Sequence, residues 1–170
     1  LILDGEFFAF LEEHVEALLA LEEAPLLHAL SRCAALKGWV VSQDERETGL
    51  RAILNYGHTV GHALEAATGY QGLLHGEAVA IGMAAAGEIS CQKGLFSREG
   101  LARQNRLLER FQLPVRLPPV DMEAVLEAMA LDKKARSGAI RWVLLAEVGR
   151  GVGDQPVEPD VSRMKISCIV

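Results

Sequence analysis

The chain has only three cysteines, and their spacing fits neither a disulfide framework nor a metal site. Cys33, Cys91 and Cys168 are odd in number and include no C-x-x-C pair. This spacing excludes a disulfide framework and a cysteine-type zinc site. We therefore expect a protein of a reducing, cytoplasmic setting.

Three other features are missing, and each excludes a class of function. The sequence has no apolar run of 18 residues, so we expect no membrane span. It has no long basic run and a net charge of −6, so we expect neither a nucleic-acid partner nor binding to a membrane surface. Gly149, Gly151 and Gly153 read G-x-G-x-G, but no strand, turn and helix surround them in the order that a nucleotide-binding loop requires.

What remains is an ordinary globular composition with helical patterning. Of the 170 residues, 50% are hydrophobic and 24% are charged, enough for one domain with a real core. Apolar periodicity, capping residues and prolines predict helices over about 5–23, 25–41, 50–67, 75–92, 97–111 and 121–131. The β-branched and aromatic run at 140–145 predicts a strand.

These elements predict a mostly all-α fold with a strand or short β-hairpin near 140–148. We expect one helical domain over 1–150 that binds metal and substrate, followed by a loose C-terminal tail over 151–170. A basic turn is expected over 132–138, with Lys133 in it.

The most informative segment is the predicted helix over 50–67. Its polar residues Arg51, Asn55, His58 and His62 recur at i, i+4, i+7 and i+11. At about 100° per residue, one helix would place all four in a stripe roughly 60° wide. Their neighbours are mostly apolar, and polar groups are costly to bury without partners. The pattern therefore favours a binding site over a packing helix.

A further histidine, His75, begins the next predicted helix. Two neutral imidazoles and a carboxylate would suit zinc and leave one position open for substrate. Spacing alone lets His58 pair with His75, or with His62 one helical turn away. It also leaves open that His62 handles protons or anions, and that the histidines are satisfied core residues.

The remaining candidates have equally plain structural interpretations. Arg51 and Asn55 can bind a ligand carboxylate or hydroxyl, but Arg51 can also pair with a nearby acid such as Glu47. Lys37 lies among apolar neighbours, where a lysine usually extends its amine to water. Lys133 can clamp an anion or simply be solvated.

Two segments closely resemble the 3-dehydroquinate synthase family. They read L-N-Y-G-H-T-V-G-H-A-L-E-A over 54–66 and L-L-H-G-E-A-V-A-I-G-M over 73–83. D-E-R-E-T-G-L-R over 44–51 and L-D-K-K over 131–134 match its pattern too. The resemblance covers about residues 1–150 and implies the family's helical C-terminal domain.

The resemblance implies an enzyme of the shikimate pathway. The family converts DAHP, a seven-carbon sugar-acid phosphate, to 3-dehydroquinate with release of phosphate. It uses NAD and a divalent metal, usually zinc, with cobalt as another candidate. By this resemblance we expect a small-molecule substrate and a cytoplasmic homodimer in the complete enzyme.

The same resemblance assigns roles to individual residues. His58 and His75 resemble two of three metal ligands, and His62 resembles a residue beside the departing phosphate. The other catalytic candidates that it implies are Lys37, Arg51, Asn55 and Lys133. It implies no NAD-binding residue in this chain.

Two parts of the family pattern are missing from residues 1–170. One is the third metal ligand, a glutamate in an A-E-x-x-K-x-G segment, and the other is the N-terminal NAD-binding domain. We therefore expect the chain alone to be inactive, as a fragment, a truncated gene product or one piece of a split enzyme. The alternative is a non-catalytic helical module that serves dimerisation or is a degenerate metal-binding unit.

Overall fold

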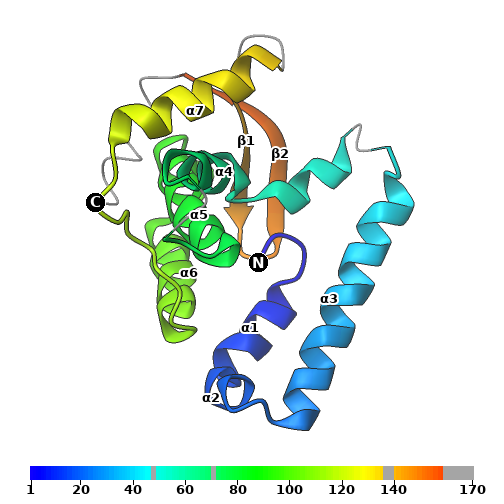
Figure 1. The fold of residues 1–170 in the computed structure, drawn as a ribbon. Coiled ribbons are helices and arrows are strands. Elements are labelled where there is room, and N and C mark those ends of the chain that lie inside the picture. Colours follow the sequence, from blue (N-terminus) through cyan, green and yellow to red (C-terminus); the bar gives the residue numbers. More distant parts are fainter. Residues whose placement is uncertain (47–48, 70–71, 136–139, 159–170) are drawn as a thin grey trace.

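The computed structural model describes residues 1–46, 49–69, 72–135 and 140–158, and it is mostly helical with one antiparallel β-hairpin (Figure 1). The elements are α1 (Gly5–Glu13), α2 (Val15–Leu19), α3 (Glu23–Gln43), the 3₁₀ helix η1 (Leu50–Asn55), α4 (His58–Ala67), α5 (His75–Gln92), α6 (Arg98–Arg110), α7 (Met122–Ala135), β1 (Ile140–Glu147) and β2 (Arg150–Val157). The predicted fold class is confirmed.

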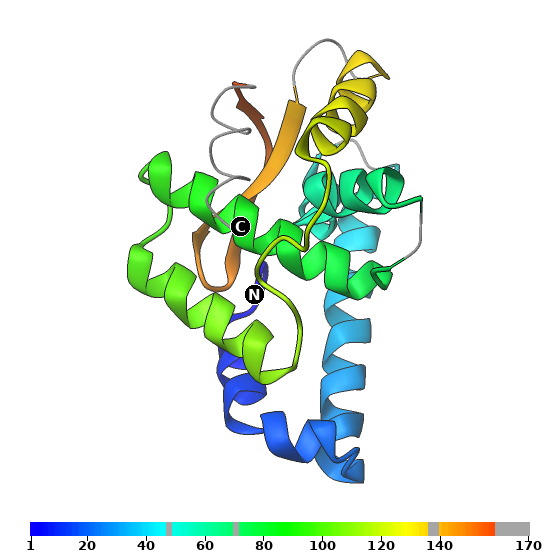
Figure 2. The same cartoon turned by 60° about the vertical axis from the view of Figure 1, so that its left-hand side comes forward.

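Helix α5 is the centre of the fold, and α4, α6 and the hairpin pack around it (Figures 1 and 2). Most of its residues are buried, and many of them are alanine or glycine. Small side chains let neighbouring backbones approach closely, as the spacing of these residues in the sequence indicates. The predicted bounds of this helix, 75–92, are those of the structure.

The hairpin corrects the prediction of a loose tail over 151–170. Strand β1 pairs with β2 from Ile140 opposite Val157 to Glu147 opposite Arg150. Residues 151–157 are therefore strand, because the ladder supplies partners for a backbone that carries few apolar side chains. The backbone N–H of Gly151 also donates to the carbonyl of Ile2 at 2.8 Å, so the N-terminal segment lies against β2. Residues 159–170 lie outside the described part of the chain.

The first predicted helix is interrupted. Only residues 5–19 form α1 and α2, because His14 leaves the helical conformation between them and residues 20–22 separate α2 from α3. Its backbone N–H donates to the carbonyl of Phe10, and its Nδ1 lies 2.9 Å from the same oxygen. These contacts satisfy the end of α1 and stop the helix. Helix α3 then extends away from the body, and Figure 1 shows it standing apart from α4 and α5.

Helix α7 is longer than the sequence pattern indicates. It continues to Ala135, so Lys133 lies in a helix and not in a basic turn. No glycine or proline occurs between Asp132 and Ala135, so nothing in the local sequence stops the helix there. The rest of the expected turn, 136–139, lies outside the described residues. Among the described helices, none is both long and apolar enough to cross a membrane.

Candidate metal and substrate site

A sharp corner precedes the histidines, and it corrects the prediction of one helix over 50–67. The 3₁₀ helix η1 ends at Asn55, Tyr56 has an extended ψ of 123°, and Gly57 has a φ of +84°. Only glycine adopts that last conformation without strain. Arg51 and Asn55 therefore do not share one α-helical stripe with the histidines, although they remain in the segment just before them.

The corner is held by a close contact between backbones. A Cβ on Gly82 of α5 would lie 1.9 Å from the carbonyl oxygen of Gly57. A Cβ on Gly61 would lie 3.2 Å from the Cα of Val79. Glycine on both sides of the crossing thus lets the start of α4 press against the middle of α5, around Val79 and Gly82.

This crossing gathers three imidazoles, as the sequence predicts. His58 is the first residue of α4, His62 follows one turn later, and His75 is the first residue of α5. The ring centroid of His58 lies 5.3 Å from that of His62 and 5.4 Å from that of His75. The rings of His62 and His75 are 6.0 Å apart. His58 is half-buried, whereas the other two are exposed.

Burial favours the neutral form of His58, and a backbone carbonyl orients its ring. Its Nδ1 lies 3.3 Å from the carbonyl oxygen of Tyr56. Because a carbonyl only accepts, Nδ1 carries the proton in this contact and Nε2 keeps a free lone pair. Burial lowers the pKa of His58, and its two histidine neighbours lower that pKa further. A neutral ring with a free nitrogen is the form that binds a metal.

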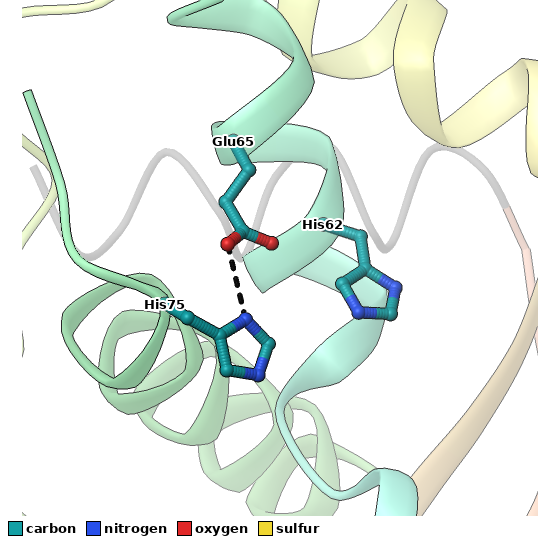
Figure 3. A group of neighbouring side chains, drawn as sticks. All are labelled: His62, Glu65 and His75. Atoms are coloured by element: carbon teal, nitrogen blue, oxygen red, sulfur yellow. Dashed lines mark hydrogen bonds and ion pairs between the residues drawn. The ribbon is translucent and has the colours of Figure 1, made fainter. Parts of the chain in front are cut away.

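Glu65 joins the cluster, and the sequence analysis missed it. Its Oε1 lies 3.0 Å from Nδ1 of His75 (Figure 3). Single ligand atoms of His62, Glu65 and His75 all lie within 4.8 Å of one another. The available signal was its position three residues after His62 and seven after His58, which places it on the same face of α4.

The donors in this cluster fit a zinc-like ion. Zinc binds histidine nitrogen at about 2.0–2.1 Å and carboxylate oxygen at similar distances, and two rings on one tetrahedral ion have centroids roughly 5 Å apart. The three observed centroid separations are close to that value. The centroid separations do not select one pair, and the group whose ligand atoms lie within 4.8 Å of one another contains His62 and His75 but not His58. The choice of His58 and His75 as the ligands stays a prediction.

Arg51 and Asn55 lie on η1, immediately before the corner. The guanidinium of Arg51 donates to the carbonyl of Glu45 at 2.9 Å, and its backbone N–H donates to Asp44 Oδ2 at 2.9 Å. Asp44 also accepts from the N–H of Gly49, so one buried carboxylate organises this loop. Asn55 is partly buried. Their substrate-binding roles stay predictions.

The two predicted lysines are not gathered with the histidines by any described contact. Lys37 is exposed on α3, in the half of that helix nearer to η1. Lys133 lies near the end of α7, and its side chain is outside the described part of the structure. Glu47 is outside the described residues as well.

The chain matches one family model and is similar to curated proteins of the same name. A family model described as 3-dehydroquinate synthase C-terminal matches residues 1–135. A 3-dehydroquinate synthase from Geotalea uraniireducens is 50% identical over 148 residues, which are 87% of this chain and 41% of the relative. One from Nostoc punctiforme is 46% identical over 165 residues, which are 95% of this chain and 46% of the relative. The chain thus spans less than half the length of these relatives.

Solved structures with a similar fold include two synthases. A 2-epi-5-epi-valiolone synthase from Streptomyces hygroscopicus, with NAD⁺ and Zn²⁺ bound, matches with a TM-score of 0.87 and 26% identity. The match covers 99% of this chain and 47% of that one. A 2-deoxy-scyllo-inosose synthase complexed with carbaglucose-6-phosphate, NAD⁺ and Co²⁺ matches with a TM-score of 0.75 and 26% identity, over 84% of this chain and 41% of that one.

Proposed function

Because the chain belongs to the 3-dehydroquinate synthase C-terminal family, we propose that it supplies the metal- and substrate-binding half of a 3-dehydroquinate synthase. In this proposal the complete enzyme converts DAHP to 3-dehydroquinate with release of phosphate. The observation that carries it is the gathering of three imidazoles at the α4–α5 crossing, on the family's own motifs. A module kept only for packing has no need of such a cluster.

The proposal assigns His58 and His75 as metal ligands for zinc or another divalent ion such as cobalt. When bound, the ion supplies a Lewis acid that grips substrate oxygens and polarises a carbonyl. NAD would accept and return a hydride, and we assign its binding to the part of a longer protein that this chain does not cover. We assign the third metal ligand, a carboxylate, to that same part.

The remaining residues of the proposal bind and orient the substrate. Arg51 carries a fixed positive charge suited to a carboxylate or phosphate. Asn55 offers both donors and acceptors to hydroxyl groups. His62 is exposed beside the two proposed ligands, where an imidazole can bind the departing phosphate or move a proton. Lys37 and Lys133 complete the proposed anion-binding set.

A zinc titration of the 170-residue chain tests the proposal. Isothermal calorimetry should show one site, and His58→Ala and His75→Ala should each weaken binding by at least about tenfold. His28→Ala is the matched control, because His28 is an exposed histidine that contacts Phe10 and not the cluster. Unchanged affinity in both cluster variants would favour the alternative, a non-catalytic helical module.

Turnover separates the chain from the complete enzyme. We propose that the 170 residues alone do not convert DAHP, because the NAD site and a third ligand are assigned elsewhere. Phosphate release by the purified chain with NAD and zinc would contradict this. A cytoplasmic location and a homodimeric complete enzyme belong to the same proposal, and sedimentation of the complete enzyme tests the dimer.

A second enzymatic candidate is a related sugar-phosphate cyclase, which the two structural matches favour. The higher identity to 3-dehydroquinate synthases supports the first candidate. A substrate panel on the complete enzyme distinguishes them, because only the first predicts a strong preference for the sugar-acid phosphate.

A further inference from the structure

We propose that Glu65 is a positioning residue that fixes the His75 ring for metal binding. The inference rests on the proposed function, since it concerns one of the proposed ligands. Glu65 would not touch the ion. It would hold the ring nitrogen on one side, so that the other nitrogen faces the metal.

The contact itself sets the proton position on the ring. Glu65 Oε1 lies 3.0 Å from His75 Nδ1. An ionised carboxylate only accepts, so Nδ1 must donate, and in the neutral ring Nε2 then keeps its lone pair. Figure 3 shows the carboxylate reaching from α4 to the near edge of the ring, with the ring's other nitrogen directed away from it.

His75 needs such a restraint more than its neighbours do. Its side chain is 57% exposed, whereas the Glu65 side chain is only 14% exposed. An exposed ring loses rotamer freedom when it binds a metal, and a partner that has already ordered it reduces that cost. The carboxylate projects from the last turn of α4 and is the more buried member of the pair, so we take it as the fixed one.

The carboxylate of Glu77, two residues after His75, already has a different partner. Glu77 Oε2 accepts from the backbone N–H of Leu74 at 2.8 Å and caps the start of α5. It therefore fixes the backbone from which His75 projects, while Glu65 fixes the ring. Histidine ligands commonly donate their second nitrogen to a carboxylate in this way, and loss of the carboxylate typically weakens metal binding by 10–100-fold.

The experiment compares Glu65→Ala and Glu65→Gln with the unsubstituted 170-residue chain. The first readout is the tautomer of His75, from long-range ¹H–¹⁵N spectra of the zinc-free protein. We expect the proton on Nδ1 in the parent and in Glu65→Gln, whose amide oxygen still accepts. We expect a mixture of tautomers in Glu65→Ala.

The second readout is zinc affinity. Glu65→Ala should bind about 10–100-fold more weakly than the parent, and Glu65→Gln should recover a large part of that loss. Glu88→Gln is the matched control. The Glu88 side chain is 20% exposed and pairs with Arg98 at 2.7 Å, away from the histidines. The zinc affinity of the Glu88→Gln variant should equal that of the parent.

Two outcomes would overturn the inference. One is a Glu65→Ala affinity within threefold of the parent, together with an unchanged tautomer. The other is a Glu65→Gln loss as large as that of Glu65→Ala with His75 still protonated on Nδ1, which would make Glu65 a direct ligand. If His58→Ala and His75→Ala both bind zinc normally, the proposed function fails, while the zinc-free tautomer still decides the role of Glu65.

Discussion

Gly57 and Gly82 contact each other backbone to backbone, and a single methyl group between them would lie 1.9 Å from a carbonyl oxygen. This contact sets the distance between α4 and α5. His58 follows Gly57 directly, and His75 begins the helix that contains Gly82. The glycine pair therefore determines whether the imidazoles from the two helices meet.

Gly82→Ala should disrupt both the fold and the site. The added methyl meets backbone and not a flexible side chain, so we expect a loss of about 3 kcal/mol, at the upper end of overpacking costs. Urea denaturation measures it, and zinc titration should show weaker binding in the remaining folded protein. A Gly82→Ala variant with parental stability and zinc affinity would contradict the close crossing.

Gly38→Ala is the matched control, and we expect it to stabilise the fold where Gly82→Ala destabilises it. Gly38 lies within α3, and nothing lies within 4 Å of a Cβ built there. Alanine is the better helix former, so we expect a gain of about 0.5–1 kcal/mol with unchanged zinc affinity. The pair of variants separates the steric effect at the crossing from the general effect of alanine.

A buried polar pair, Tyr56 and Gln104, also supports this corner. The hydroxyl of Tyr56 donates to Gln104 Oε1 at 2.7 Å, and Gln104 Nε2 donates to the carbonyl of Met83 at 3.0 Å. Tyr56→Phe should cost about 1–3 kcal/mol, because it leaves the amide oxygen without a donor inside the core. Thermal or urea unfolding measures this loss.

A double variant, Tyr56→Phe with Gln104→Leu, tests whether these two side chains interact. Replacing both polar partners removes the unsatisfied group, so the double variant should lose less than the sum of the two single losses. Strictly additive losses would mean that the two side chains do not interact.

The sequence predicted the site better than it predicted the backbone that carries it. The histidines and their convergence follow from local spacing and from a recognisable motif. The corner at Tyr56 and Gly57 does not, because the α-helical period continues through it and the cause is a tertiary contact with α5. The sequence did not predict a role for Glu65, because a glutamate on a helix is usually solvated. Only the folded structure shows that Glu65 contacts His75.

The prediction of a strand or short β-hairpin near 140–148 did not extend to β2 at Arg150–Val157. The segment at 149–153 has glycine at every second position, which is a weak strand signal. The structure forms β2 there because β1 and the N-terminal segment supply hydrogen-bond partners. Strand β1 adjoins β2 in the sequence whereas Ile2 is distant, and the propensity of the segment itself reveals neither partner. By contrast, α5 depends on its own small-residue pattern, and its bounds were predicted correctly.

Lys37→Ala should leave zinc binding unchanged. The side chain is exposed on α3, and a protonated amine is not a metal ligand. We expect a change in unfolding free energy of less than about 0.5 kcal/mol, as for other exposed sites. Calorimetry with zinc checks the first expectation. A tenfold loss of zinc affinity would place Lys37 in the metal site and not among the proposed substrate-binding residues.

Asp4 should make the stability of the chain sensitive to acid. Its carboxylate accepts from the N–H of Phe7 at 2.8 Å and from Nε of Arg32 at 2.7 Å, which joins α1 to α3. The hydrogen bond from Phe7 lowers the pKa of Asp4, and Arg32 lowers that pKa further. The unfolded chain therefore binds more protons than the folded one as the pH falls through the acid range. The stabilisation is complete above about pH 5 and is lost as the pH falls below about 4.

Asp4→Asn isolates this charge effect, because asparagine is an equally good N-cap residue. We expect it to be less stable than the parent at pH 7, and we expect this difference to shrink at pH 2.5, because proton uptake by the unfolded parent removes part of the stabilisation that the charge provides. Asp4→Ala, which removes the cap as well, should lose about 0.5–2 kcal/mol more than Asp4→Asn at either pH. Urea denaturation at the two pH values measures all three proteins. An Asp4→Asn deficit of the same size at pH 2.5 and pH 7 would mean that the ionised carboxylate does not stabilise the junction of α1 and α3.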